Sequence, residues 1–80
     1  PLNKWNVSNV KYMNSMFSYT DSFNQPLNLW NVSNVITTEA MFFGAISFNQ
    51  YIKNWTLPTH SDTSFMFYDA ANFNKKINWK

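Results

Sequence analysis

The stretch Pro26–Gln50, PLNLWNVSNVITTEAMFFGAISFNQ, decides the fold because it is one unit of an internal repeat. Moved back by its own length, it matches Pro1–Gln25, PLNKWNVSNVKYMNSMFSYTDSFNQ. Moved forward by the same length, it matches Tyr51–Lys75 more loosely, as YIKNWTLPTHSDTSFMFYDAANFNK. A spacing shared along the chain is the signature of a repeat architecture, and it has to be recognised before local structure is assigned.

The repeat places apolar side chains in columns that recur once in each unit. If the units stack as successive coils, each column becomes a ladder through the protein, and each coil contacts only its neighbours. We therefore expect these columns to form the core. The ladder residues are Trp5, Trp30, Trp55, Met16, Met41, Met66, Phe17, Phe42, Phe67, Phe23, Phe48 and Phe73. A further column holds Leu2, Leu27, Ile52 and Ile77.

Composition limits the chain to one small domain whose core depends on aromatic residues. The 80 residues contain no cysteine and a single histidine, His60, so neither a disulfide nor a usual zinc site can support so short a chain. Aromatic residues make up 20% of the chain, and a buried aromatic side chain covers roughly 150–250 Å². The missing disulfides also argue against a disulfide-framed secreted module.

The charge balance gives little indication of a partner. The formal net charge is +2, and the local cluster Lys75, Lys76 and Lys80 is interpreted as a solvated chain end. The sequence has neither a run of ~18 apolar residues nor a signal-peptide pattern. Because it starts inside the repeat and without Met, we expect a single repeat domain cut from a longer array. Its units are residues 1–25, 26–50 and 51–75, with a partial fourth at 76–80.

Each unit is predicted to contain one short helix. After the polar cluster Asn6–Asn9, apolar and small residues follow at spacings of three and four, as on one face of an amphipathic helix. Ser8 or Asn9 is a suitable N-cap. The predicted helices are Val10–Ser18, Val35–Phe43 and His60–Tyr68. Helices this short are marginal alone in water and need neighbouring coils to cover them.

The other half of each unit is predicted to be extended. Pro26 excludes a helix interior, and the residues after it show no helical period. The segments Leu2–Trp5, Leu27–Trp30 and Ile52–Trp55 would then pair in parallel, one from each coil. The predicted fold class is therefore α/β: a leucine-rich-repeat-like solenoid with a short helix and a short parallel strand in each coil.

The string SFNQPLNLWNVSNV, followed by a Met-Phe pair and a second SFNQ, resembles the repeats of BspA-like bacterial surface proteins and of mycoplasma-type surface lipoproteins. The resemblance covers nearly the whole chain and is weaker in the third unit, where Pro58 and His60 replace Ser and Val. It implies an extracellular, cell-surface protein with a role in adhesion or host-protein binding. It carries no catalytic residues to transfer.

Catalysis and metal binding have little support. The acids Asp21, Glu39, Asp62 and Asp69 form no convincing carboxylate pair, which a hydrolytic site would need. The single His60 is interpreted as a residue near a helix start. Gly44 is the one glycine, so a glycine-rich phosphate loop is excluded. We expect no enzyme, no cofactor and no metal, and the scarcity of clustered cations argues against nucleic acid.

Two recurring motifs have a structural and a functional interpretation. The glycosylation sequon is matched by Asn6-Val7-Ser8, Asn31-Val32-Ser33 and Asn54-Trp55-Thr56, but because two of these share a phase of the repeat, a ladder of Asn-Ser turns is the preferred interpretation. The column Trp5, Trp30 and Trp55 would form a stacking platform for sugars if exposed. A core ladder is preferred, because Trp recurs beside the segment expected to be extended.

The function that we predict is a non-catalytic repeat module that presents a protein-binding surface. Since stacking fixes the columns, binding should use outward positions, with Tyr12, Tyr19, Phe43 and Tyr68 as the best contacts. The other outward positions are Lys4, Lys11, Ser18, Leu29, Ile36, Glu39, Tyr51 and Lys53. The alternatives are a structural spacer or stalk and a carbohydrate-binding module. Uncapped coil ends also predict flanking repeats or end-to-end self-association.

Overall fold

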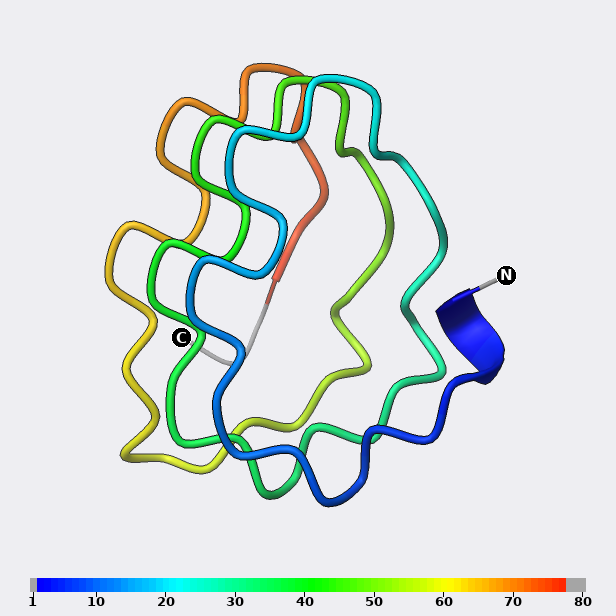
Figure 1. Ribbon diagram of the computed structural model, residues 1–80, viewed down its shortest axis with the longest axis vertical. Helices are drawn as coiled ribbons and strands as arrows, with labels where there is room; N and C mark the ends of the chain where they lie inside the picture. The colour runs from blue at the N-terminus through cyan, green and yellow to red at the C-terminus, as the bar shows by residue number, and fades with distance from the viewer. Residues whose placement is uncertain (1, 78–80) are drawn as a thin grey trace.

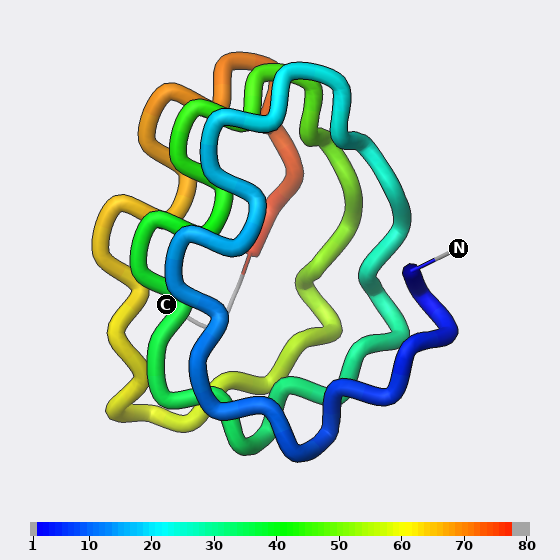
Figure 2. Tube along the Cα trace, in the orientation of Figure 1, coloured from blue at the N-terminus to red at the C-terminus, as the bar shows by residue number. Residues whose placement is uncertain are grey.

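The computed structural model describes residues 2–77, and over that range the chain forms three coils that lie side by side (Figure 1). Positions one repeat apart are neighbours, since Tyr12 pairs with Thr37 and Thr37 pairs with Asp62, both in parallel. Figure 2 shows that each coil follows nearly the same path as the coil before it. The body measures 27 × 26 × 20 Å. Pro1 and the end of the partial fourth unit, residues 78–80, lie outside the described residues.

Regular secondary structure is sparse in this part of the chain. Within residues 2–77 the one regular element is the 3₁₀ helix η1, Leu2–Lys4, and the parallel pairings are isolated bridges. The predicted α/β leucine-rich-repeat-like solenoid, with a helix and a strand in each coil, is therefore wrong. Successions of turns replace the helices expected at Val10–Ser18, Val35–Phe43 and His60–Tyr68.

The backbone hydrogen bonds explain why these segments are not helical. Between Met13 and Tyr19, every second amide of the first coil donates to a carbonyl of the second coil, at N···O distances of 2.7–3.0 Å. These donors are Met13, Ser15, Phe17 and Tyr19. An amide between them, that of Met16, donates to the carbonyl of Met13 three residues back. An α-helix needs each amide for a bond to the fourth residue before it, so this alternation excludes one.

Left-handed residues close the turns. Two positions of each unit have φ between 55° and 67°: Ser15, Ala40 and Phe65 at the first, and Tyr19, Gly44 and Asp69 at the second. They lie third in four-residue turns such as Thr38–Met41 and Phe42–Ala45, closed by bonds of 2.9 and 3.0 Å. A positive φ at the third position is the mark of a type II turn. A right-handed helix cannot pass through such residues.

The apolar spacing that predicted helices comes from these successive turns. In the second coil, Val35, Thr38, Met41 and Ala45 are all fully buried, at spacings of three and four. Each turn advances the chain by a few residues and returns it to the interior. A pattern of inward residues every three or four positions therefore fits a row of turns as well as a helix.

The predicted parallel pairing of the segments Leu2–Trp5, Leu27–Trp30 and Ile52–Trp55 is also wrong. Each of them is a turn, closed by the Trp amide donating to the carbonyl three residues earlier at 2.9–3.1 Å. Side chains make the contact between coils here instead. The Asn3 Nδ2 group donates to Asn28 Oδ1 at 3.1 Å, and the Leu29 amide donates to Asn3 Oδ1 at 2.9 Å.

Two columns of phenylalanine rings form the centre of the core. Phe17, Phe42 and Phe67 stack with centroids 5.5–5.6 Å apart, and their planes are within 12° of parallel. Phe23, Phe48 and Phe73 form a second column at 5.8–5.9 Å. Within each coil the two columns touch, since Phe42 lies 4.0 Å from Phe48 and the other two coils match it closely. Such parallel stacks hold each coil in register with the next.

The Trp and Met columns extend this core, but their members in the first coil, Trp5 and Met16, are exposed. Trp30 and Trp55 stack at 6.3 Å and are 3% and 2% exposed. Their indole N–H groups each donate at 2.8 Å to a backbone carbonyl of the preceding coil. Trp5 is 57% exposed. Met41 and Met66 are buried, whereas Met16 is 41% exposed because no coil precedes its own within the described residues.

Candidate functional site

A row of exposed aromatic side chains crosses the three coils. Tyr19 lies 5.5 Å from Phe43, and Phe43 lies 5.2 Å from Tyr68, measured between ring centroids. Tyr68 makes an edge contact with Phe65 at 6.1 Å. Phe43 is half-buried, while the two tyrosines and Phe65 are exposed by 56–73%. We call Tyr19, Phe43, Tyr68 and Phe65 the aromatic row.

Hydrogen bonds between the coils and the turns at Tyr19 and Gly44 position this row. The Tyr19 amide donates to the Phe43 carbonyl at 2.7 Å, and the Gly44 amide donates to the Tyr68 carbonyl at 2.8 Å. Tyr19 itself has a φ of 59°, which directs its ring over Gly44 of the next coil. A Cβ atom added to Gly44 would lie 3.1 Å from Tyr19 Cδ1, so a larger residue there would require the Tyr19 ring to shift, and glycine also adopts the φ of 67° without strain.

The structure gathers three of the four predicted contact residues. Tyr12 lies at the parallel bridge to Thr37, is 66% exposed, and makes no ring contact with the aromatic row. Sequence reasoning missed Phe65. The signal was present, because Phe65 stands where the other units have the small residues Ser15 and Ala40. A large apolar residue at a column that is otherwise small or polar indicates an outward position.

The remaining outward positions and the polar motifs are accounted for by the fold. Of the predicted outward residues, Ser18 and Phe43 are half-buried, and the others are exposed. The Asn-Ser motif forms a local turn, since Asn6 Oδ1 accepts from both the amide and the hydroxyl of Ser8. Asn31 accepts from the Ser33 amide in the same way.

The acidic side chain of Asp62 stabilises a turn in the same manner. Asp62 Oδ1 accepts from the Ser64 amide at 2.9 Å, and Ser64 in turn accepts from Ala40 of the second coil through its carbonyl. His60 is exposed. Within residues 2–77, no three His, Cys, Asp or Glu residues lie close enough together to hold a metal ion.

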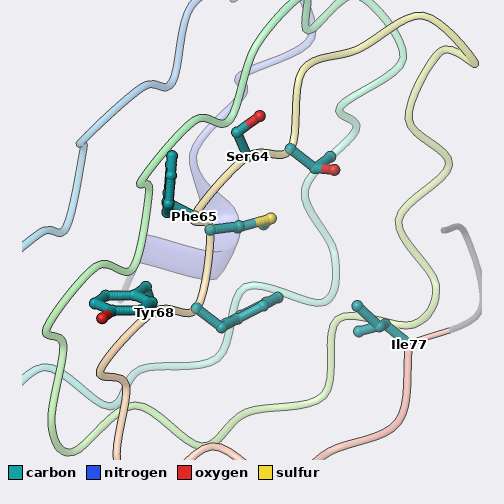
Figure 3. Close-up of a pocket in the computed structure, with 7 residues that line it drawn as sticks. Ser64, Phe65, Tyr68 and Ile77 are labelled. Carbon is teal, nitrogen blue, oxygen red and sulfur yellow. The ribbon is translucent and has the colours of Figure 1, made fainter.

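The three-tryptophan platform for sugars is not formed, because Trp30 and Trp55 are buried. Two hollows lie elsewhere. The larger, about 500 Å³, opens on the third coil, and Ile77 lies across it from Phe65 (Figure 3). We call it the end cavity; it is lined by Thr63, Ser64, Phe65, Met66, Phe67, Tyr68 and Ile77. The smaller, about 290 Å³, is lined by Tyr51 and by lysines, with Lys75 Nζ 4.3 Å from the Tyr51 ring centroid.

Comparison with known proteins gives a family and no further match. Among the described residues, the structure has no helix with the length and apolar character needed to cross a membrane. No curated protein and no solved structure matches the chain. A family model matches residues 1–80, which is the whole sequence, and its description is "Mycoplasma protein of unknown function, DUF285". The chain therefore belongs to the DUF285 family of Mycoplasma proteins.

Proposed function

We propose that the chain is a non-catalytic, cell-surface repeat module whose aromatic row contacts a protein partner in adhesion or host interaction. The observation that carries this proposal is the continuity of the row. Every coil contributes at least one ring, and the rings touch across both coil boundaries. A connected strip of exposed aromatic side chains is unusual on a protein that has no partner.

The chemistry of the row favours a protein as the partner. Tyrosine and phenylalanine supply large, rigid contact surfaces with few rotatable bonds, and tyrosine is enriched at the energetic centres of interfaces. The tyrosine hydroxyls add hydrogen-bonding groups at the rim of the strip. A formal net charge of +2 spread over 80 residues gives no strong field for an anionic polymer.

The proposed location at the cell surface rests on the resemblance of the repeats to those of known surface proteins. The chain belongs to a Mycoplasma family, and its SFNQPLNLWNVSNV string resembles the repeats of BspA-like and mycoplasma-type surface lipoproteins. That resemblance implies an outward-facing protein. We accordingly propose an extracellular position for this repeat domain.

Substitution of the row tests the proposed function. The variants Tyr19→Ala, Phe43→Ala and Tyr68→Ala are compared with Tyr51→Ala, an aromatic outside the row whose exposure lies between those of Tyr19 and Tyr68. Binding is measured by surface plasmon resonance against a panel of extracellular-matrix proteins and glycans. We expect each row variant to weaken a protein signal about tenfold or more, as at an interface hot spot, and Tyr51→Ala to leave it unchanged.

The same panel separates the proposal from its alternatives. A signal from glycans alone would replace the protein partner by a carbohydrate. A protein signal that survives all three row substitutions would contradict the assignment of the row. A complete lack of binding by the folded chain would favour the structural spacer, which needs only the stacking of coils.

A further inference from the structure

The smaller of the two hollows gathers half of the lysines of the chain. It has a volume of about 290 Å³ and is lined by Tyr51, Lys53, Asn74, Lys75 and Lys76. We call it the lysine hollow. Three of the six lysines lie around it, and none of the four acidic residues of the chain lines it. Because like charges repel one another, an anion bound among these lysines would be attracted by all three.

The lysine hollow opens on the outer side of the coils. The Asn74 amide donates to Asn49 Oδ1 at 3.1 Å, and an equivalent bond joins Asn49 to the preceding coil. In this register Tyr51, two residues after Asn49, has Pro26 on one side and Lys76 on the other. With a neighbouring segment on both sides, Tyr51 is still 61% exposed. Its exposure therefore comes from its outward position in the coil.

The third unit departs from the repeat at two positions that build the lysine hollow. Lys53 replaces the Asn of the other units, where Asn3 Nδ2 donates to Asn28 Oδ1 at 3.1 Å. Lys75 replaces Gln50, whose Nε2 group donates to two oxygens of the preceding coil at 3.0 and 3.1 Å. The stacking of coils uses side-chain amides at these positions. It does not account for two lysines there, which indicates a role other than stacking.

A contact with Tyr51 holds one of these lysines in place. The Lys75 Nζ atom lies 4.3 Å from the Tyr51 ring centroid, a cation–π contact, and Lys75 is half-buried. Lys75 therefore does not fit the interpretation of the C-terminal lysines as a solvated chain end. A lysine side chain that is already ordered loses less conformational entropy when it binds a ligand.

We propose that the lysine hollow binds a phosphate or sulfate group, carried by a small molecule or by a lipid headgroup. The ammonium groups of Lys53, Lys75 and Lys76 are point charges with three N–H donors each, which suits a tetrahedral oxyanion. A planar carboxylate is better matched by the fork of arginine, which the chain lacks. The Tyr51 hydroxyl and the Asn74 amide can donate further hydrogen bonds. The volume lies at the lower end of the range for small-molecule pockets, so the bound group is small.

Titration of the full chain with inorganic phosphate, and separately with inorganic sulfate, tests the proposal by NMR of the backbone amides at constant ionic strength. A range of about 0.1–20 mM suits a single weakly bound anion. We expect the amide resonances of residues 51–53 and 74–76 to shift and to saturate. The variants Lys53→Asn and Lys75→Gln restore the residues of the other units. Each should weaken binding about tenfold, the lower limit for loss of a hydrogen bond to a charged group.

The matched control is Lys11→Gln, which removes the same charge from an exposed lysine outside the lysine hollow. It should bind phosphate like the unmodified chain. Unchanged resonances away from the substituted residue show that each variant is folded. A lack of saturable shifts, shifts spread over the whole surface, or equal effects of Lys11→Gln and Lys53→Asn would each overturn the proposal.

Two further probes distinguish the source of the anion. Glycerol 3-phosphate presents a phosphate ester in solution, and phosphatidylcholine vesicles that contain phosphatidic acid present one at a lipid surface. Tighter binding of the soluble ester supports a small-molecule ligand. Tighter binding of the vesicles, weakened in Lys75→Gln, supports a lipid headgroup. Vesicle binding that is equally strong in Lys75→Gln would contradict the assignment to the lysine hollow. The proposal does not depend on the function of the aromatic row.

Discussion

The middle coil and the two outer coils have nearly the same path but differ sharply in burial. In the middle coil, Met41, Phe42 and Phe48 are fully buried. The equivalent of Met41 in the first coil, Met16, is 41% exposed. The equivalent of Phe42 in the third coil, Phe67, is half-buried. The position of a coil in the stack, more than the residue type, therefore determines how deeply a column residue is buried and how much it contributes to stability. Most of the stability of so small a domain should accordingly be concentrated in its middle coil.

The largest expected difference in stability between the coils is that between the variants Phe42→Ala and Phe67→Ala. Phe42 contacts Phe17, Phe48 and Phe67 and is fully buried, so its truncation should cost about 3–5 kcal/mol, enough to unfold a marginal domain. Among residues 2–77, no ring stacks on the outer face of Phe67, so the loss at Phe67 should be roughly half as large. Urea unfolding followed by tryptophan fluorescence measures both. Equal losses at the two positions would show that the middle coil has no special weight.

A smaller difference in stability is expected between the variants Trp30→Phe and Trp5→Phe, which also compare a buried column residue with an exposed one. The Trp30 indole N–H donates to the Leu2 carbonyl at 2.8 Å, and the side chain is 3% exposed. Its replacement removes this hydrogen bond but leaves the carbonyl with the Trp5 amide as a donor, so it should cost about 0.5–1.5 kcal/mol. Trp5 is 57% exposed, so its replacement should change stability by no more than about 0.5 kcal/mol. Thermal unfolding by circular dichroism compares the pair, and a larger loss at Trp5 would contradict the burial argument.

Sequence and structure agree on the spacing of the columns and disagree on the local backbone. The alignment of Phe17 with Phe42, and of Trp30 with Trp55, is visible in the sequence because a stack puts equal residues in equal places. The helix at Val35–Phe43 was a wrong prediction because Ala40 is a good helix former that here has a φ of 55°. Contacts with both neighbouring coils override that local preference.

For the candidate site, too, the sequence predicted one part of the arrangement and not the other. Tyr19, Phe43 and Tyr68 were predicted from their place outside the core columns, and the structure brings their rings together. The contact of Phe43 with Tyr68 follows from the repeat, since the two stand one unit apart, whereas the contact of Tyr19 with Phe43 could not be predicted because it depends on the turn at Tyr19. Phe65 reaches Tyr68 from a turn of its own, where its φ is 57°, and Tyr12 lies at the bridge to Thr37, outside the row.

The smallest expected effect comes from two glycine variants, Ala40→Gly in the middle coil and Ser15→Gly in the first. Comparing them shows whether backbone strain at the turn depends on how deeply the coil is buried. Both residues have a positive φ, 55° and 60°, which is unfavourable for a residue with a Cβ atom and free of that penalty for glycine. Each change should therefore stabilise the fold by about 0.5–1 kcal/mol. The gain should be the same at both sites, because the strain belongs to the turn and not to the depth of the coil. Urea midpoints of the two variants measure it. A gain at one site alone would mean that neighbouring coils distort the turn, and that the coils are not equivalent even in their backbone.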